Sequence, residues 1–312
     1  MAVVWITGAR GFIGQHLSVE LRDRGHCVAG IGHGHWDVTE FNRVGLAHWM
    51  NSEIHGSSLD SMLALAGRPS LIFHLAGGST VGASFANPFE DFERTVQTTV
   101  RLMDWVRSRC PDCGVVAVSS AAVYGSVHSA PISEAAVAAP YSPYGYHKWM
   151  MESVLRSYGQ NFGLRGSVVR LFSAYGTGLR KQLLWDFCSK LRSADGILTL
   201  DGSGDERRDW IEVRDIARLL ASVAVSNVSE SVPTLNGGTG IAMSVREVAE
   251  ALLRAIGVEA EIRFSGRRRT GDPNYLVADV ATLGRSGFKH RVSVEQGFRE
   301  YAAWFETEVG RT

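Results

Sequence analysis

The sequence carries no excess charge of either sign, because 32 Lys and Arg residues balance 32 Asp and Glu residues among its 312 residues. Broad binding to the nucleic-acid backbone needs a basic surface, so this balance argues against nucleic acid as a partner. The sequence also lacks an apolar run near the roughly 20 residues that cross a bilayer. Its first residues show neither a basic stretch nor a small-residue cleavage site of the kind that directs secretion. We therefore expect a cytoplasmic protein with no membrane partner.

Cysteine is scarce as well, with four residues at Cys27, Cys110, Cys113 and Cys188. Cys110 and Cys113 have the CxxC spacing, but a zinc site needs a second pair of ligands, and none stands at a suitable spacing. His33 and His35 likewise lack a third ligand. We expect four reduced structural thiols and no metal site.

What the sequence does contain is an alternation of strand-like apolar runs and helical patterns through its first half. Strands are predicted at residues 3–6, 27–31, 70–75, 114–118 and 166–171, and helices at 12–21, 89–107 and 143–158. Between residues 32 and 54 the pattern indicates mostly loop and a poor helix, followed by a short strand around 53–55. Buried apolar strands that alternate with helices are typical of a parallel sheet covered on both faces. The sequence therefore predicts an α/β fold with a doubly wound parallel sheet.

A glycine-rich turn, Thr-Gly-Ala-Arg-Gly-Phe-Ile-Gly at residues 7–14, follows the first strand and opens the first helix. Glycines permit a tight turn and a close approach of the backbone to phosphate, and the helix N-terminus offers free N–H groups. The alternative is a glycine-rich turn without a ligand. We expect a dinucleotide to bind at Gly8, Arg10, Gly11, Phe12, Ile13 and Gly14.

The end of the second predicted strand has no carboxylate. Many NAD-binding proteins place Asp or Glu there to hold the ribose hydroxyls, whereas this chain reads Gly-Ile-Gly-His-Gly-His at 30–35, and Asp37 comes several residues later. An acidic group would repel a 2′-phosphate, while the guanidinium of Arg10, assisted by His33, would attract one. We therefore predict NADP(H) as the preferred cofactor, with NAD(H) as the alternative.

Tyr144 and Lys148 are four residues apart on a predicted helix, so their side chains share one face. A nearby ammonium favours the phenolate over the phenol, whose ordinary pKa is about 10. Such a tyrosine can take a proton from an alcohol or give one to a carbonyl. Ser120, at the end of a predicted strand, is placed to hydrogen-bond the same oxygen. The predicted catalytic residues are Ser120, Tyr144 and Lys148.

Together these motifs resemble the extended short-chain dehydrogenase/reductase family of nucleotide-sugar epimerases, dehydratases and 4-ketoreductases. The segments at 7–14, 74–77, 119–125, 141–148, 170–176, 208–210 and 269–272 are similar to the family's motifs in the same order. The resemblance implies a Rossmann-type fold, with Leu75, Ala76 and Gly77 beside the nicotinamide. It implies a dinucleotide-binding domain at 1–171, to which 209–239 returns, and a smaller α/β substrate domain from 172–208 and 240–312.

The same resemblance implies a nucleotide diphosphate-sugar substrate. The positions carried over as substrate contacts are Ser120, Ser173, Gln182, Arg208 and Arg269. Two guanidiniums can neutralise a diphosphate through bidentate hydrogen bonds. Ser173 departs from the family, which usually has Asn there. Relatives usually dimerise through a four-helix bundle, which here would use 89–107 and 143–158, with Val96, Val100, Met103, Met150, Met151 and Val154 as candidate contacts.

Positions at which this chain departs from the family's motifs reduce the number of candidate reactions. Sugar 4,6-dehydratases usually follow the catalytic serine or threonine with Asp-Glu, whereas this chain has Ala121 and Ala122. We predict NADPH-dependent reduction of a nucleotide-linked 4-keto-6-deoxy sugar at C4, with Tyr144 as the proton donor. The alternative is an NAD-dependent nucleotide-sugar 4-epimerase similar to UDP-glucose 4-epimerase. A third reading is a non-catalytic NAD(P)-binding protein.

Overall fold

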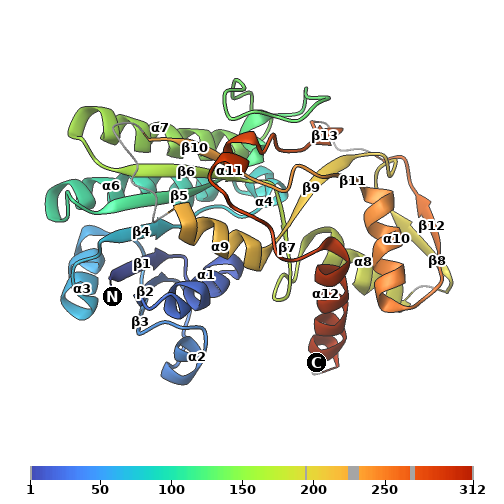
Figure 1. The fold of residues 1–312 in the computed structure, drawn as a ribbon, viewed down its shortest axis with the longest axis horizontal. Coiled ribbons are helices and arrows are strands. Elements are labelled where there is room, and N and C mark those ends of the chain that lie inside the picture. Colours follow the sequence, from blue (N-terminus) through green and yellow to red (C-terminus); the bar gives the residue numbers. More distant parts are fainter. Residues whose placement is uncertain (1, 194, 224–231, 268–270, 311–312) are drawn as a thin grey trace. The chain divides into compact units, whose positions relative to one another are not determined.

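The structure is a computed structural model that describes residues 2–193, 195–223, 232–267 and 271–310. The chain divides into two compact units. The first combines residues 1–125, 136–171 and 216–235, and the second combines 126–135, 172–215 and 236–312. Each unit is thus assembled from three separate stretches of chain (Figure 1).

The first unit is built on a seven-stranded sheet with the order β10-β6-β5-β4-β1-β2-β3. Neighbouring strands from β6 to β3 run parallel. The sequential strands β1 and β2 lie side by side, whereas β4 pairs with the other edge of β1, so the strand order reverses there. Ligands in such sheets bind beyond the carboxyl ends of the strands at this reversal. The strands are β1 (Val3–Thr7), β2 (Cys27–Gly32), β3 (His48–Asn51), β4 (Leu71–His74), β5 (Gly114–Ser120), β6 (Gly166–Leu171) and β10 (Thr234–Gly237).

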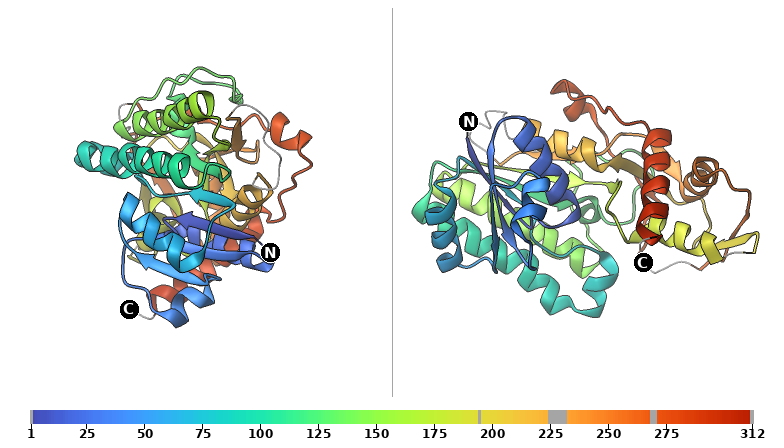
Figure 2. Two further views of the ribbon diagram at one scale, coloured as in Figure 1. Left: turned by 90° about the vertical axis from the view of Figure 1, so that its left-hand side faces the viewer. Right: turned by 90° about the horizontal axis from the view of Figure 1, so that it is seen from below.

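Helices cover both faces of this sheet (Figure 2). One core lies between the sheet and α3, α6 and α7, where Trp5 stacks on Trp105 with ring centroids 5.4 Å apart. On the other face α1 and α9 lie together, and Arg24 donates a hydrogen bond to the Arg218 carbonyl. The helical segments are α1 (Phe12–Asp23), α2 (Val38–Arg43), α3 (Gly56–Ala66), α4 (Val81–Ala86), α5 (Pro88–Phe92), the π-helical turn η1 (Glu93–Gln97), α6 (Thr98–Arg109), the 3₁₀ turn η2 (Ala121–Tyr124), α7 (Pro143–Phe162) and α9 (Val213–Val223).

The second unit contains two small sheets. β9 pairs with β7, β11 and β13 in one, and β8 pairs in parallel with β12 in the other. Tyr175 packs edge-to-face on Phe298, and this contact joins the sheet that contains β9 to α12. The elements are β7 (Ser173–Tyr175), α8 (Gln182–Ser193), β8 (Ile197–Leu200), β9 (Arg207–Glu212), β11 (Ala242–Ser244), α10 (Val245–Ile256), β12 (Glu261–Phe264), β13 (Tyr275–Leu276), α11 (Ala281–Arg285) and α12 (Val294–Val309).

The doubly wound α/β fold predicted from the sequence is confirmed. Two local predictions were wrong. The strand expected at 53–55 lies earlier, at β3, and the single helix expected at 89–107 is interrupted by the η1 turn. The segment that returns to the first unit is 216–235, which is shorter than the 209–239 expected. Among the described residues, no helix combines the length and apolar character that crossing a membrane requires.

Candidate active site

The glycine-rich turn after β1 passes unusually close to its neighbours. Gly8 has a φ of +72°, in the left-handed region, and its N–H donates to the Ile31 carbonyl at 2.8 Å. A Cβ on Gly8 would lie 3.0 Å from the Ala76 nitrogen, and one on Gly14 would lie 2.6 Å from the Gly8 carbonyl oxygen. Gly11 caps α1 with no side-chain hydrogen bond, so the first N–H groups of α1 have no side-chain acceptor at the cap. This backbone fits a pyrophosphate.

Arg10 lies at the tip of β2. A Cβ on Gly34 would come within 2.1 Å of an Arg10 guanidinium nitrogen, so the guanidinium rests against the Gly34 backbone. Asp37 is occupied as the cap of α2, where it accepts hydrogen bonds from the Glu40 N–H at 2.9 Å and the Thr39 hydroxyl at 2.6 Å. The tip of β2 therefore presents a cation and no free carboxylate. His33 is exposed there.

A buried polar chain ties the ends of β1 and β4 to α6. His74 is fully buried between the hydroxyls of Thr7, at 2.8 Å from Nδ1, and Thr99, at 2.9 Å from Nε2. Burial, with a smaller effect of Lys148, lowers the pKa of His74 to about 3, so the ring is neutral. Thr7 also accepts the Ala76 N–H at 3.2 Å, which fixes the turn at Leu75, Ala76 and Gly77. No local pattern in the sequence marks this hydrogen-bonded network, because Thr7 and His74 are 67 residues apart and His74 and Thr99 are 25 residues apart.

The predicted proton-handling residues come together where β5 ends and α7 begins. Lys148 is buried and donates from Nζ to the Val118 carbonyl at 3.0 Å, and Nζ lies 5.9 Å from the centre of the Tyr144 ring. Ser120 hydrogen-bonds Tyr144. Ser142 caps α7 and Pro143 fills its first position, so the helix start that presents Tyr144 is fixed locally.

Electrostatics at this site differ from the sequence expectation. Burial raises the pKa of Tyr144, the hydrogen bond with Ser120 opposes that, and Asp91 raises it further. Burial lowers the pKa of Lys148 to about 8, although Asp91 and Glu152 favour its charged form. The expected lowering of the tyrosine pKa by the neighbouring ammonium is therefore not seen here, because desolvation is the largest effect.

A second buried network lies directly behind Ser120. Glu152 is fully buried and accepts hydrogen bonds from Ser119 at 2.6 Å, from Arg170 at 2.7 and 2.9 Å, and from Arg156 at 2.8 Å. Arg170 also stacks over the Tyr124 ring at 4.7 Å. These contacts join β5, α7 and β6 at the end of β5 that carries the serine.

Three of the residues predicted to contact the sugar nucleotide, Ser173, Gln182 and Arg208, lie in the second unit. Ser173 begins β7, and Arg208 is half-buried in β9. Gln182 begins α8 with a φ of +68°, the one non-glycine residue with a positive φ in the described part of the chain. Such strain is a marker of functional positions. Arg269 lies outside the described residues.

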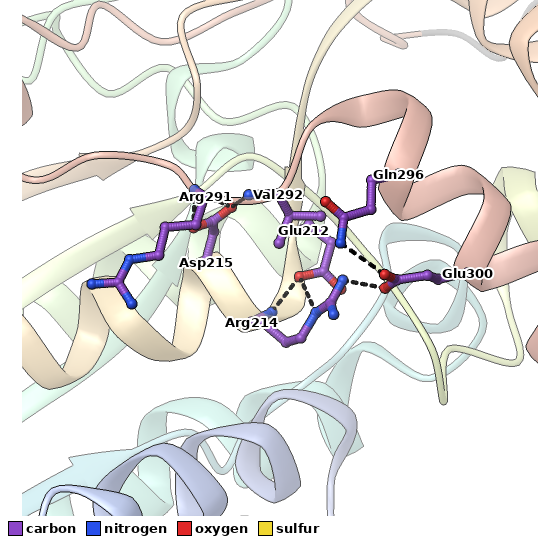
Figure 3. Close-up of polar contacts among 7 residues, drawn as sticks. All are labelled: Glu212, Arg214, Asp215, Arg291, Val292, Gln296 and Glu300. Atoms are coloured by element: carbon purple, nitrogen blue, oxygen red, sulfur yellow. Dashed lines mark hydrogen bonds and ion pairs between the residues drawn. The ribbon is translucent and has the colours of Figure 1, made fainter.

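Carboxylates around β9 serve the fold of the second unit (Figure 3). Asp215 accepts the backbone N–H groups of Arg291 at 2.9 Å and Val292 at 3.0 Å. Arg214 lies between Glu212 and Glu300 and pairs with both. Asp209, inside β9, accepts three backbone N–H groups and the Thr239 hydroxyl. Within the residues that the structure describes, no group of three or more His, Cys, Asp and Glu side chains is arranged to hold a metal ion.

Comparison with known proteins gives consistent matches. The model of the "NAD dependent epimerase/dehydratase family" matches residues 4–235. The UDP-glucose 4-epimerase of Azospirillum brasilense is 30% identical, covering 88% of this chain and 83% of its own. That of Rhizobium meliloti (strain 1021) is 29% identical, covering 88% of each chain. The solved structure of Thermus thermophilus UDP-glucose 4-epimerase in complex with NAD has a TM-score of 0.85 at 26% identity, covering 97% of this chain and 99% of that one.

Proposed function

The chain belongs to the NAD dependent epimerase/dehydratase family, as its motifs predicted, and from this premise we propose that it is an NAD-dependent 4-epimerase of UDP-linked sugars. The observation that carries the proposal is the meeting of Ser120, Tyr144 and Lys148, with Lys148 Nζ against Gly77 in the turn after β4. Ala121 and Ala122 add no acid or base next to the serine, so elimination of water lacks its proton carriers. The relatives named above favour this reading over the keto-sugar reductase that the sequence analysis preferred.

The backbone near Gly8 and Gly14 fits a dinucleotide, since side chains there would fill the space that a pyrophosphate approaches. Gly8, Arg10, Gly11, Phe12, Ile13 and Gly14 would hold its phosphates and adenosine, and Leu75, Ala76 and Gly77 would adjoin its nicotinamide. A bound dinucleotide would supply a reversible acceptor for the hydride of the sugar C4, so the overall reaction would involve no net oxidation.

The protein's own part is to move one proton. Tyr144, as phenolate, takes the proton of the sugar C4 hydroxyl as that carbon loses its hydride, and gives the proton back when the hydride returns to the opposite face. Ser120 hydrogen-bonds the same oxygen and orients it. The Lys148 ammonium, 5.9 Å from the ring centre, would favour the phenolate against the burial that raises the Tyr144 pKa. Arg208 and Arg269 would neutralise the diphosphate, and Ser173 and Gln182 would contact the sugar nucleotide.

The β2 tip supports a second candidate, the NADPH-dependent reduction at C4. Arg10 lies against Gly34, and Asp37 Oδ1 is engaged in capping α2, so a guanidinium stands at the tip of β2 where a 2′-phosphate would bind. The solved relative from Thermus thermophilus, in contrast, has NAD. We propose NAD for the epimerase and treat NADP(H) as the outcome that would identify the reductase.

A homodimer through α6 and α7 is part of the proposal. Val100, Trp149 and Met150 are 40%, 39% and 41% exposed on these helices. Three of the residues expected there from the sequence, Val96, Met103 and Met151, are instead buried within the chain. The interface would therefore use the outer faces of the two helices.

The test is to identify the nucleotide released from the purified protein by acid and to follow UDP-glucose and UDP-galactose interconversion by NMR without added cofactor. We expect NAD and interconversion, and Tyr144→Phe should lose activity by about 10²–10⁴-fold, the usual contribution of general acid–base catalysis. Consumption of NADPH with a 4-keto-6-deoxy sugar, and no interconversion, would replace the epimerase with the reductase. Sedimentation velocity measures the dimer, which Met150→Glu should dissociate.

A further inference from the structure

A buried carboxylate–imidazole pair lies next to the proton-handling group and is not used in the mechanism above. His147 Nδ1 lies 2.6 Å from Asp91 Oδ2, and the two side chains are 12% and 6% exposed. A carboxylate accepts only, so the imidazole is the donor. The Phe92 ring packs edge-to-face on the imidazole, with centroids 5.6 Å apart. The pair joins α5 to α7, one residue before Lys148.

The Asp91 carboxylate points at the turn that follows β4. A Cβ on Gly78 would lie 1.8 Å from Asp91 Oδ1, so this oxygen rests against the Gly78 backbone. A Cβ on Gly77, the neighbouring residue, would lie 3.3 Å from Lys148 Nζ. The Gly77–Gly78 turn is therefore flanked by the Asp91 carboxylate and the Lys148 ammonium. Thr95 of η1 holds the same turn by accepting the Gly78 N–H at 2.8 Å.

We propose that Asp91, held by His147, is a positioning residue that provides the counter-charge for Lys148 and so keeps that ammonium charged beside Tyr144. The proposal deepens the proposed epimerase function and rests on it. Asp91 touches neither substrate nor reacting atoms in this scheme and acts through Lys148.

The charges around the site agree with this assignment. Burial is the main influence on Lys148 and lowers its pKa to about 8, and Asp91 is the largest of the groups that oppose this, ahead of Glu152. Glu152 is already engaged by Ser119, Arg156 and Arg170.

The other elements around the pair contribute no competing charge. His74 on β4 is neutral, with its pKa lowered to about 3 chiefly by burial. On α5 and η1, Glu90 and Arg94 pair with each other at 2.5 Å on the exposed side. Among the described residues no ion pair joins Asp91 to a lysine or an arginine, so the Asp91 charge remains available to Lys148.

The test compares Asp91→Asn with Glu90→Gln, which removes one carboxylate charge from the adjacent, exposed position. Asparagine keeps the shape and an oxygen that accepts from His147, so it removes the charge alone. His147→Asn is the conservative variant, because its amide can donate to Asp91, and His147→Leu removes the donor. Two measurements are made on the purified protein with its bound dinucleotide: the pH profile of kcat/KM, and the absorbance titration of the Tyr144 phenolate. Subtracting the matching Tyr144→Phe protein isolates this tyrosine from the other seven.

Removing a nearby negative charge makes every neighbouring acid lose its proton more easily. In Asp91→Asn we expect both limbs of the profile to move to lower pH, the alkaline limb by about one pH unit, which is a tenfold loss on its alkaline side. Because the Asp91 charge also raises the pKa of Tyr144 directly, the phenolate titration should move to lower pH as well. His147→Leu should shift the pH profile and the phenolate titration by less than Asp91→Asn does. His147→Asn and Glu90→Gln should leave the pH profile and the titration unchanged.

A merely structural role for Asp91 would lower the rate without moving either limb, and that result overturns the proposal. So does a phenolate titration that is the same in Asp91→Asn and Glu90→Gln. If the unsubstituted protein fails to epimerise any UDP-sugar but the phenolate titration still moves in Asp91→Asn, the proposed function is wrong while the charge coupling stands.

Discussion

Replacing Glu152 with Gln should destabilise the first unit strongly, because it removes the carboxylate that neutralises the buried Arg170 guanidinium. Arg170 is 4% exposed and directs two hydrogen bonds at Glu152, at 2.7 and 2.9 Å. Breaking a buried ion pair by removing one partner costs about 3–5 kcal/mol. We expect the free energy of unfolding, measured by urea denaturation at pH 7, to fall by that amount. The control Glu20→Gln breaks the partly exposed pair with Arg24 and should cost less than about 1 kcal/mol.

The pH dependence of this loss gives an independent test. Burial alone would raise the pKa of Glu152, but hydrogen bonds from Arg170, its charge and the Ser119 hydroxyl outweigh it and hold the pKa below its ordinary value. The stabilisation is therefore present above the unfolded pKa, about 4.3, and is lost as the pH falls through the lower, folded value. The difference in free energy of unfolding between the unsubstituted protein and Glu152→Gln should therefore become smaller as the pH falls below about 4.3.

Removing both charges should be milder than removing one. In Glu152→Gln/Arg170→Met the buried cation is gone, so part of the lost stability should return. The reasoning would be refuted if Glu152→Gln lowered the free energy of unfolding by less than about 1 kcal/mol, the range of an exposed pair. It would also be refuted if the stability difference between the two proteins stayed the same from pH 7 to acidic pH.

Two further substitutions test the cofactor turn and the second unit. Gly14→Ala would place its Cβ 2.6 Å from the Gly8 carbonyl oxygen, so it should weaken dinucleotide binding and lower the free energy of unfolding by about 1–3 kcal/mol. The control Gly56→Ala, whose Cβ meets nothing within 4 Å, should leave stability unchanged or raise it. Calorimetry with NAD and urea denaturation of both proteins would measure the two effects. Asp215→Asn weakens the acceptor for the N–H groups at 291–292 and should cost about 1–3 kcal/mol. Faster amide hydrogen exchange at 291–292 would support this origin, and unchanged exchange would contradict it.

Much of the first unit could be predicted because its strands are buried on both faces and appear as short apolar runs. The glycine turn and the Tyr144–Lys148 spacing are local patterns, so the sequence alone places them. The η1 turn could not be found in this way. Its residues look helical, and the π conformation shows only in three dimensions, where the Thr95 hydroxyl accepts the Gly78 N–H.

Hydrogen-bonded pairs between residues far apart in the sequence also could not be predicted, because they form only when the chain is folded. Asp91 and His147 are 56 residues apart, and nothing local to either marks them as partners. The predicted NADP preference used one local feature, the missing carboxylate after β2. The choice between epimerase and reductase depends on how a sugar is held, and residue types at single positions do not specify that.

The order of the strands has a consequence for how the protein is made. β10, at the edge of the large sheet, pairs with β6 and comes from residues 234–237, so it is synthesised after β7 and β9 of the second unit. Until the ribosome has released these residues, β6 presents an unpaired edge, which is a template for pairing with other chains. A truncated protein ending at residue 171 would keep the glycine-rich turn and Tyr144 and would still be prone to aggregate.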